Sequence, residues 1–555
     1  MSALEGVTLP PAGATRSRIT LVVAASCAGT VFEWYDFFIF GSLAAIIGAH
    51  FYADAGASQS YVFALLTFAA GFAVRPVGAL VFGRYGDRNG RKRAFLITIT
   101  LMGVATIGVG LLPDSRSIGL LAPCALVFLR VIQGFAIGGE YGGAAIYVAE
   151  HASPDRRGAA TGWIQAAATL GLFLALGVIL SCRTALGEAA FRSWAWRIPF
   201  LLSAALLIIS LWIRLRLEES PLYRRIQQEG SASKAPLAES FLRWSNLRIV
   251  LLALFGLLMG QGVVWYTAQF YTQFFLEGVV KVAPALVNAL VMVATAASAP
   301  LHMFFAWLSD SVGRKPVMLF GLGLAVVSFI PGFQLLAQSA NPALVAAAAH
   351  APVTIVSAPA DCSLQFDLIG KTKFSSSCDI AKGALAGAGV PYRNQAAAPG
   401  APARVRIGST TITSPGGRTL DAARLAAAKA NFLSTLKRAL RSAGYPGSAD
   451  GRALDVARTL GLLLIFIVAA AALYGPQAAA LVELFPTRIR YSALSLPYHI
   501  GVGWFGGFLP VTAYAIVVAT GNIYAGLWYP TIVAAIGFVV TFLFLPETRK
   551  RNIET

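Results

Sequence analysis

Carboxylates and guanidinium groups interrupt several long apolar segments of this chain. Glu33 and Asp36 lie in the apolar segment 20–48. They are three residues apart, so a helix places them on one face. An ionised carboxylate in apolar surroundings is costly, so such a group faces water, pairs with a cation or carries a proton. The sequence predicts proton loading and release here, with Asp36 as the favoured carrier. A static ion pair with Arg75 or Arg130 is the alternative.

Arg75 and Arg130 provide positive charge in two other apolar segments. A guanidinium stays protonated, but its forked donors bind a carboxylate, whether from a solute or from the protein itself. For Arg75 two interpretations stay open. It binds an anionic solute, or it forms a structural pair or a gate beside Pro76.

Polar side chains recur at helical spacing on one face of three further apolar segments. They are Thr161, Gln165 and Thr169; Gln261, Trp265, Gln269 and Thr272; and Asn288, Thr295, Ser298 and His302. Interhelical hydrogen bonding explains any one of these residues. Three polar stripes turned toward a common axis fit a hydrated central cavity. The residues expected to bind a solute there are Arg75, Tyr35, Gln165, Gln261, Trp265, Gln269 and His302.

Two short basic loops share the pattern Asp-x-x-Gly-Arg-Lys. The residues expected to act in them are Gly83, Asp87, Arg88, Gly90 and Arg91 in the first loop, and Asp310 and Arg314 in the second. An acid among these cations can accept hydrogen bonds from a helix N-terminus or pair with an arginine. We expect each acid to form a contact that holds the two halves of the protein together on the cytoplasmic side, and we call such a contact a latch. The second loop has Ala306 and Ser311 at the positions of Gly83 and Arg88. We therefore expect the second latch to be weaker. Asp87→Asn should then impair the activity of the protein more than Asp310→Asn does.

One apolar segment has glycine at every fourth position. Gly134, Gly138 and Gly142 predict a groove for close helix packing. Glu140 lies nearly opposite this groove on a helix, and it is a candidate partner for a basic loop or for the cavity.

The composition indicates a membrane protein. The chain is 57% hydrophobic and 12% charged, with a mean hydropathy of +0.68. A soluble protein of 555 residues cannot hide so much apolar surface, so lipid is the expected solvent. The net charge of +19 then reflects Lys and Arg in cytoplasmic loops, and we expect no nucleic-acid partner. The sequence has no phosphate-binding loop, metal-ligand cluster or nucleophile elbow, so we expect neither an enzyme nor an ATP-driven pump, and no cofactor.

Twelve apolar segments are long enough to form membrane helices. They are 20–48, 61–82, 94–112, 119–149, 159–181, 198–217, 248–276, 285–308, 316–338, 459–482, 491–520 and 525–545. The first is expected to be a span rather than a cleaved signal peptide. Lys and Arg gather in alternate loops. This bias predicts a multi-pass protein of a bacterial-type inner membrane with both termini in the cytoplasm.

The chain repeats itself with one interruption. Asp87 matches Asp310 at an offset of 223, whereas Glu150 matches Glu483 at an offset of 333. The difference, 333 − 223 = 110 residues, indicates an insertion in the second half. The predicted domains are a first six-helix half (1–217), a cytoplasmic linker (218–247), a second half in two parts (248–340 and 459–555), and the insertion (341–458).

The insertion joins the ninth and tenth spans, so it is expected outside the cytoplasm. Its predicted elements are strands at 353–356, 363–369 and 405–413 and an amphipathic helix at 419–442. An alternative places an extra span at 343–359, but that would put Arg488 and Arg490 outside, against the charge bias.

Two cysteines of the insertion are candidates for a disulfide. In an oxidising compartment Cys362 and Cys378 can close a loop of about 15 residues, contributing about 3 kcal/mol. Two free thiols are the alternative.

Further motifs accompany the two basic loops. They are Glu33-Trp34-Tyr35-Asp36-Phe37, Arg75-Pro76-Val77-Gly78, Arg130-Val131-Ile132-Gln133-Gly134, Gly138-Gly139-Glu140-Tyr141-Gly142, Trp196-Arg197-Ile198-Pro199-Phe200, Glu219-Ser220-Pro221, Tyr474-Gly475-Pro476 and Glu483-Leu484-Phe485-Pro486-Thr487-Arg488. Together they resemble the metabolite:proton symporter branch of the major facilitator superfamily, over nearly all of the chain except the insertion. The resemblance implies two six-helix halves that alternate access to a site between them. It also implies a role for Arg130 in coupling.

The expected protein is an all-α polytopic membrane protein of twelve helices, with a small α+β extracytoplasmic insertion between helices 9 and 10. We expect it to work as a monomer that takes up a small organic acid together with protons. Glu33, Asp36 and Arg130 are the expected coupling residues. The expected partners are the solute, the proton and the lipid bilayer. The alternatives are a symporter for a zwitterionic osmolyte such as proline or betaine, and a transporter-like receptor that senses a solute through the insertion.

Overall fold

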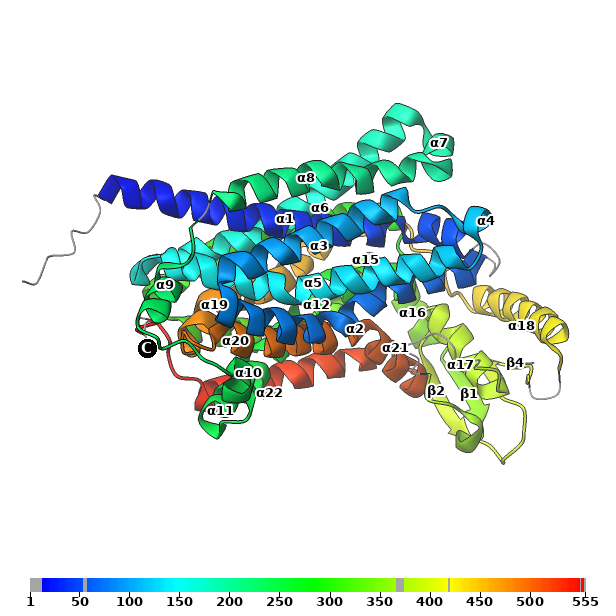
Figure 1. Cartoon of the computed structure of the whole chain (residues 1–555). Coiled ribbons are helices and arrows are strands. Elements are labelled where there is room, and N and C mark those ends of the chain that lie inside the picture. Colours follow the sequence, from blue (N-terminus) through cyan, green and yellow to red (C-terminus); the bar gives the residue numbers. More distant parts are fainter. Residues whose placement is uncertain are drawn as a thin grey trace, which may run out of the picture.

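The computed structural model describes residues 12–52, 57–216, 218–365, 374–417, 420–549 and 551–553. Long helices lie side by side in one bundle, and a small unit of strands and helices covers one end of it (Figure 1). Within the described residues, eleven helical segments are long and apolar enough to cross a membrane.

The first half contains α1 (Ala12–Phe51), α3 (Arg91–Leu111), α5 (Leu121–His151), α6 (Arg157–Leu186) and α8 (Ile198–Leu215). The second half contains a seventh span from Trp244 to Val279, then α14 (Pro284–Val312), α15 (Arg314–Ala340), α19 (Val456–Leu484), an eleventh span from Arg490 to Thr520, and α22 (Trp528–Phe544). A further long helix, α2 (Ala57–Asn89), covers the predicted span 61–82. Each predicted span thus coincides with an observed helix apart from its ends.

Two spans of the second half are interrupted by π-helical turns. The seventh span consists of α11 (Trp244–Leu252), α12 (Met259–Tyr266) and α13 (Thr272–Phe274), separated and followed by π-helical turns η4 (Ala253–Leu258), η5 (Thr267–Tyr271) and η6 (Phe275–Val279). The eleventh span consists of α20 (Arg490–Tyr498), the π-helical η8 (His499–Gly506) and α21 (Leu509–Thr520). Such turns are rare and occur frequently at functional sites.

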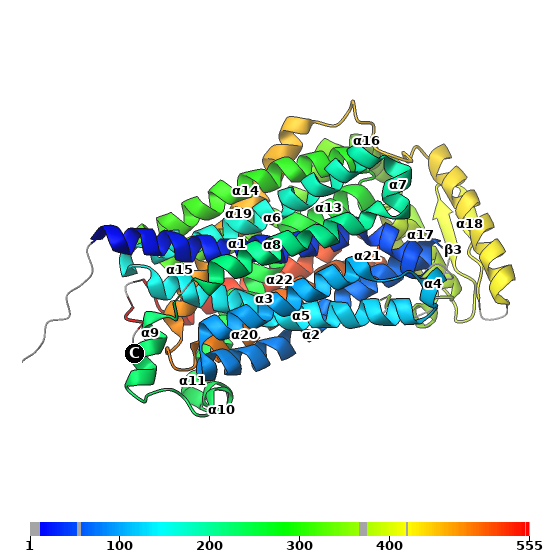
Figure 2. The same cartoon turned by 45° about the horizontal axis from the view of Figure 1, so that its top comes forward.

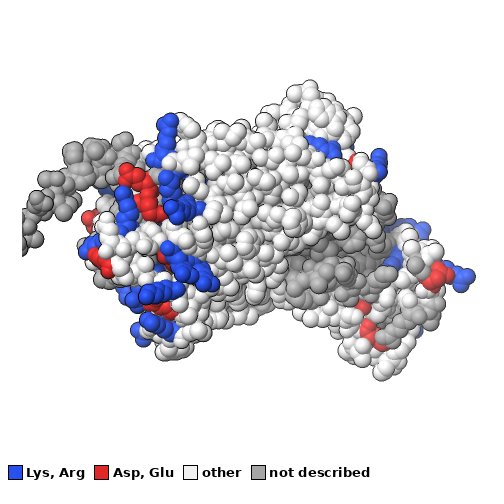
Figure 3. Space-filling model, viewed as in Figure 1, with Lys and Arg blue, Asp and Glu red and all other residues white. Residues whose placement is uncertain are grey.

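The two halves meet along paired helices. The helix α2 packs against α20, and α6 packs against α14. Charged side chains gather at the two ends of the molecule, and a broad belt between them is nearly free of charge in the view of Figure 3. The insertion lies at one end of the bundle, and the start of α1 and the last described residues lie at the other (Figures 1 and 2).

The insertion folds as a four-stranded sheet with helices. Its elements are α16 (Pro342–His350), β1 (Val353–Ser357), α17 (Ser377–Gly387), β2 (Tyr392–Ala396), β3 (Arg404–Ile407), β4 (Thr410–Thr413) and α18 (Ala422–Ser442). The strand order is β2-β1-β3-β4, with β1 and β2 parallel and the other neighbours antiparallel. Phe432, Leu436 and Leu440 of α18 are buried in the core of this unit, as the predicted amphipathic helix requires.

Two sequence expectations for the insertion are corrected, and the alternative that the charge bias disfavoured does not form. The predicted strand 405–413 is a pair of strands, β3 and β4, because the chain turns at Gly408 with a φ of +55°. No strand forms over 363–365, and the rest of the predicted strand 363–369 lies outside the described residues. The alternative span at 343–359 is wrong, because a nine-residue helix ends at His350 and strand β1 follows.

Cys362 and Cys378 form a disulfide in the structure, with their Cα atoms 5.2 Å apart. The bond ties the segment after β1 to the start of α17. Replacing both cysteines with serine is expected to lower the free energy of unfolding of the insertion by about 3 kcal/mol. Limited proteolysis in increasing urea measures this loss of stability. The control is Cys182→Ser, which replaces a buried cysteine that is not in a disulfide. Alkylation of both thiols in the unreduced protein would contradict the bond.

Candidate functional site

A cavity lies between the two halves. Its walls come from α1, α2, α5 and α6 of the first half and from the seventh, tenth and eleventh spans of the second. The lining residues are Thr30, Glu33, Trp34, Arg75, Tyr141, Ile164, Gln165, Gln261, Trp265, Tyr266, Tyr474, Tyr498, His499, Val502 and Gly503. Of the residues predicted to bind a solute, the structure brings Arg75, Gln165, Gln261 and Trp265 to this cavity.

Several polar atoms of the lining have no partner in the described part of the chain. They are the Arg75 Nε, both amide atoms of Gln261 and the Nε2 of His499. Arg75 lies with its guanidinium carbon 4.0 Å from the centre of the Phe72 ring, and no ion pair is recorded for it or for Glu33 among the described residues. Buried polar groups are nearly always hydrogen-bonded. The cavity therefore presents unused donors and acceptors to a polar molecule.

Aromatic rings form much of the cavity wall and join the two halves. Trp34 of α1 meets Trp265 of α12 edge to face at 5.2 Å. Tyr141 of α5 stacks on Tyr498 of α20 with ring centres 3.7 Å apart and planes 8° apart. The Tyr498 hydroxyl lies 3.2 Å from that of Tyr474. An aromatic face attracts cations as well as apolar groups.

Asp36 faces the interior of the first half rather than the cavity. Its carboxylate accepts hydrogen bonds from Thr106 (2.9 Å) and Gln133 (3.0 Å), and it pairs with Arg130 at 3.4 Å. The side chain is 1% exposed. The expectation that Glu33 and Asp36 share one site is therefore corrected: a helix turns about 100° per residue, so positions three apart differ by about 60°. Glu33 lines the cavity, and Asp36 lies behind it.

Three predicted solute contacts lie elsewhere. Tyr35 points into the first half and donates its hydroxyl hydrogen bond to the carbonyl of Pro199 (2.7 Å). Gln269 accepts a hydrogen bond from Thr295 (2.8 Å) and does not line the cavity. His302 is buried beside the ring of Tyr474, outside the lining, with no partner for either ring nitrogen among the described residues. Each side chain turns away because helical spacing fixes which residues share a face but not which face meets the cavity.

The first basic loop is fastened to the second half. The Asp87 carboxylate accepts hydrogen bonds from the backbone N–H groups of Tyr491 (3.2 Å) and Ser492 (2.8 Å). These groups lie at the N-terminus of α20. A carboxylate at this position meets free N–H groups and the positive end of the helix dipole. We call this contact the first latch.

The second basic loop makes the equivalent contact with the first half. The Asp310 carboxylate accepts hydrogen bonds from the backbone N–H groups of Gly158 (2.8 Å) and Ala159 (2.7 Å) at the start of α6. It also pairs with Arg314 at 2.6 Å, and Arg314 in turn pairs with Glu483 at 3.1 Å. We call this contact the second latch.

Buried ion pairs cross between the halves beside both latches. Glu150 pairs with Arg490 at 2.6 Å, and Glu483 pairs with Arg157 at 3.5 Å. Both pairs repeat at the same offset, since 150 + 333 = 483 and 157 + 333 = 490. Each half therefore supplies one acid and one arginine to a crossed arrangement. The sequence showed these residues only as equivalent positions of the repeat. Their common offset of 333 was the signal that they form equivalent ion pairs.

The relative strength of the two latches stays a prediction, and the packing of Ala306 argues against a weaker second latch. Ala306 packs against Gly158 and Gly162, where its methyl group has room. In the first half the small residue is on the other side of the contact, because Gly83 packs closely against Ser492. The glycine lies in the first half at both contacts, as Gly83 in one and as Gly158 and Gly162 in the other. Ala306 therefore fits in the second contact without separating the two halves.

Other residues of the first basic loop have different roles. Arg91 is buried and pairs with Glu150. Gly90 has a φ of +108°, and a Cβ there would lie 2.5 Å from the carboxylate of Glu219, so only glycine fits. Arg88 is exposed and makes no recorded ion pair with a described residue, which removes it from the predicted latch.

Glu140 partners neither a basic loop nor the cavity. It pairs with Arg214 of α8 at 2.6 Å and accepts a hydrogen bond from Thr98 at 3.1 Å. Both charged side chains are 1% exposed. Glu140 therefore ties helices of the first half to one another, which corrects the prediction of a gating role.

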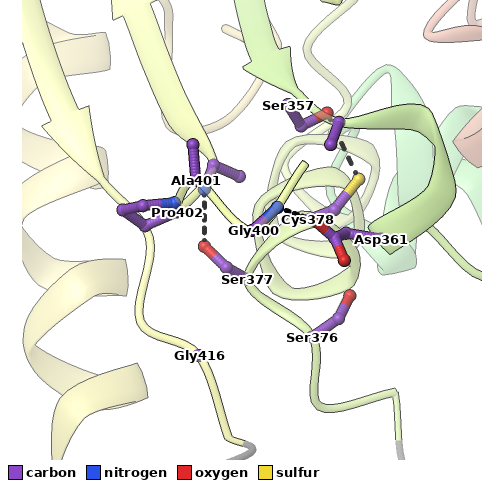
Figure 4. A pocket seen from close by; sticks show the side chains of 11 residues that line it. Ser357, Asp361, Ser376, Ser377, Cys378, Gly400, Ala401, Pro402 and Gly416 are labelled. Carbon is purple, nitrogen blue, oxygen red and sulfur yellow. Dashed lines mark hydrogen bonds between the residues drawn. The ribbon is translucent and has the colours of Figure 1, made fainter. Parts of the chain in front are cut away.

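A second hollow lies in the insertion (Figure 4), at the N-terminus of α17. Several of its polar groups are already bonded within the protein. The Ser377 Oγ accepts a hydrogen bond from the N–H of Ala403 (2.8 Å), and Asp361 accepts one from the N–H of Gly400 (3.1 Å). Ser376 accepts one from the N–H of Asp379 (3.0 Å). These bonds hold the loops that surround the hollow in place.

Comparison with known proteins gives one family and a consistent set of relatives. The family model described as "Sugar (and other) transporter" matches residues 21–240 and 451–555. The Shikimate transporter of Escherichia coli is 36% identical over 329 residues, which are 58% of this chain and 74% of that protein. The Glycine betaine/proline/ectoine/pipecolic acid transporter of Dickeya dadantii is 27% identical over 566 residues, 100% of this chain and 87% of that protein. The Proline/betaine transporter of Escherichia coli is 34% identical over 349 residues, 60% and 67% of the two chains.

Among solved structures, the proton:xylose symporter XylE, bound to 6-bromo-6-deoxy-D-glucose, superposes with a TM-score of 0.60. The alignment covers 97% of this chain and 98% of that one at 15% identity. A likeness at this identity shows the fold alone.

Proposed function

The chain belongs to the major facilitator superfamily, and from this premise we propose that it is a twelve-span symporter that takes up a small carboxylate-bearing solute together with protons. The relatives are membrane transporters, not enzymes. The observation that carries the proposal is the cavity between the halves, where neither Arg75 nor the neighbouring unpaired polar atoms have an ionic or hydrogen-bonded partner in the described part of the chain.

Arg75 is the proposed anchor for the solute. The Arg75 guanidinium is half-buried, and a forked contact with a carboxylate satisfies two of its donors. Shikimate, proline and betaine differ in shape, yet each carries one carboxylate. A common anchor at Arg75 fits all three, and an organic acid remains our first choice of substrate class.

A zwitterionic osmolyte is the second candidate, and a specific observation favours it. The cavity holds Glu33 and several aromatic rings as well as Arg75. Aromatic faces bind ammonium groups, and a carboxylate adds an opposite charge. A zwitterion would place its carboxylate on Arg75 and its cationic end among Trp34, Trp265 and Glu33.

Proton coupling is proposed for Asp36 and Arg130. The carboxylate lies within the first half, is shielded from solvent and has a guanidinium beside it. Protonation of Asp36 would free Arg130 and change how α1, α3 and α5 pack. Alternating access would follow from opening and closing of the first and second latches, both of which are closed here.

We propose that the latches face the cytoplasm, that the termini lie on that side of the inner membrane, and that the insertion lies outside the cytoplasm. The placement of the insertion opposite the start of α1 and the last described residues (Figure 1) supports this topology, as does the gathering of Lys and Arg at the end that carries the latches (Figure 3). A cavity enclosed by the two halves of one chain suits a monomer.

Uptake into proteoliposomes under an imposed pH gradient tests the proposal. Candidate acids and osmolytes are first screened for thermal stabilisation of the purified protein. We expect accumulation of a carboxylate-bearing solute that an uncoupler abolishes. Accumulation that the uncoupler leaves unchanged would overturn proton coupling.

Arg75→Gln is expected to weaken solute binding about 10-fold to 100-fold, because a charge-assisted contact contributes about 1.5–3 kcal/mol. Glu33→Gln separates the two substrate classes. A zwitterion is expected to lose affinity in both variants, whereas an acid without a cationic group loses it only with Arg75→Gln. Calorimetric titration measures both affinities. Unchanged affinity in Arg75→Gln would exclude the proposed anchor.

A further inference from the structure

The last turn of the eleventh span is capped by the insertion. The final four carbonyl groups of a helix have no partner within it. At the end of α21, the carbonyl of Val517 bonds to the N–H of Gly521 (2.8 Å). The carbonyls that follow, from 518 to 521, all accept hydrogen bonds from the insertion.

Three residues of the insertion supply these donors. Tyr392 donates its hydroxyl to the carbonyl of Val518 and its N–H to the carbonyl of Gly521 (2.9 Å). The amide of Asn394 donates to the carbonyls of residues 519 (3.2 Å) and 520 (3.1 Å). The ammonium of Lys382 donates to residue 519 as well (3.4 Å). A lysine at a helix C-terminus also meets the negative end of the helix dipole.

The insertion holds the end of the seventh span in a similar way. Lys281 follows that span and has a φ of +64°. Its ammonium donates to the carbonyl of Gly387 at the end of α17 (2.7 Å), and its carbonyl accepts from the N–H of Ala449 (2.8 Å). A Cβ on Gly389 would lie 1.9 Å from the carbonyl oxygen of Val279, so the insertion and the end of the seventh span are in close contact. Burial lowers the pKa of both Lys281 and Lys382 below the ordinary value.

The two spans that the insertion holds are the two in which the described residues form π-helical turns. They also supply Gln261, Trp265 and Tyr266, and Tyr498 and His499, to the cavity. The turns interrupt regular hydrogen bonding next to these residues. A span with such an interruption is less constrained in rotation and rise, so its position depends more on how its ends are held.

We propose that Lys382, Tyr392 and Asn394 are positioning residues for the cavity: by capping the eleventh span, the insertion sets where Tyr498 and His499 lie. The effect on solute affinity rests on the proposed function, whereas the effect on the span does not. The insertion is then a fixed part of the second half, and it moves with that half.

The test uses the full chain with the double substitution Lys382→Ala and Asn394→Ala. Arg393→Ala is the matched control, because Arg393 lies between the capping residues on β2 and is exposed. Hydrogen exchange is measured by mass spectrometry without solute over residues 513–521 and 498–506. We expect about tenfold faster exchange in both segments of the double variant, as the loss of one or two hydrogen bonds gives, and no change in the control. Unchanged exchange at 513–521 would overturn the capping, and unchanged exchange at 498–506 would overturn the positioning.

Transport by the same variants gives the second readout. The double variant is expected to raise the KM about fivefold with its maximal rate within about twofold, and restoring a donor with Lys382→Arg in place of Lys382→Ala should recover part of the affinity. A KM equal to that of the control would contradict an effect on the cavity. If no candidate solute is transported by the unaltered chain, the proposed function fails, and hydrogen exchange still decides the inference.

Discussion

Asp36→Asn is expected to abolish accumulation of the solute under a pH gradient while leaving exchange of solute across the membrane intact. Asparagine keeps the size of the side chain and still bonds to Thr106 and Gln133, which surround Asp36. It cannot take up and release a proton. One pH unit supplies about 1.4 kcal/mol per proton, which supports about tenfold accumulation. The variant should only equilibrate the solute, and proteoliposome uptake measures the difference.

A folding defect must be separated from a loss of coupling. Asp36→Asn leaves the buried Arg130 without its ion pair, and breaking a buried pair costs about 3–5 kcal/mol. The double variant Asp36→Asn with Arg130→Gln removes both charges. It should regain much of the thermal stability and still fail to accumulate solute. Regained accumulation in the double variant would mean that Asp36 balances charge and carries no proton.

Glu33→Gln is measured in parallel for coupling, since Glu33 is the other acid of α1, lies one helical turn away and lines the cavity. If Asp36→Asn still accumulates solute and an uncoupler still abolishes it, the proton passes elsewhere. Glu33 is then the remaining acid of α1 to test. The two outcomes are distinct because the structure separates the surroundings of the two acids.

The helices and the repeat were predictable because lipid imposes a simple rule on the sequence. A membrane helix needs about 20 apolar residues, and its ends carry the charge. Asp87 and Asp310 mark equivalent points, as do Glu150 and Glu483, and the difference between the two offsets, 333 − 223 = 110, indicates an insertion between 315 and 483. The structure places the small unit of strands and helices in this range.

The surroundings of α1 were not predictable from spacing. Tyr35 and Asp36 both turn into the first half, whereas Glu33 and Trp34 face the cavity. Positions along one helix differ by about 100° per residue, and which direction faces the other half depends on packing between helices. Of the sequence stripe, Gln261 and Trp265 line the cavity and Gln269 does not, because the π-helical turn at 267–271 changes the register of the seventh span.

The parallel strand β2 was missed for a related reason. Its residues 393–396 are exposed and mostly polar, so they lack the apolar alternation by which a strand is predicted. What fixes this strand is pairing with β1 and contact with α21. Both are tertiary contacts.

Asp310→Asn is expected to disturb transport at least as much as Asp87→Asn. Both acids cap a helix of the opposite half, and asparagine is also a good cap. The difference is the ion pair. Asp310 pairs with Arg314 at 2.6 Å, whereas the recorded ion pair of Arg91 in the first loop is with Glu150. Neutralising Asp310 therefore removes a buried ion pair as well as a charge at a helix N-terminus.

The size of the effect follows from the contacts that hold the latches closed. A hydrogen bond to a charged group contributes about 1.5–3 kcal/mol, so neutralising Asp310 should shift the balance toward the open state about 10-fold to 100-fold. The rate of thiol labelling by a reagent added on the side of the latches measures this shift. The labelled group is a cysteine that replaces Ser495, which is buried between the halves beside Gly142. The background carries serine at Cys27, Cys124 and Cys182. Arg88→Ala is the control, because that side chain is exposed on the same loop.

Faster labelling in Asp87→Asn than in Asp310→Asn would mean that the presence of Ala306 and Ser311 in the second loop makes the second latch the weaker one. The equivalence of the two contacts would then not extend to their energies.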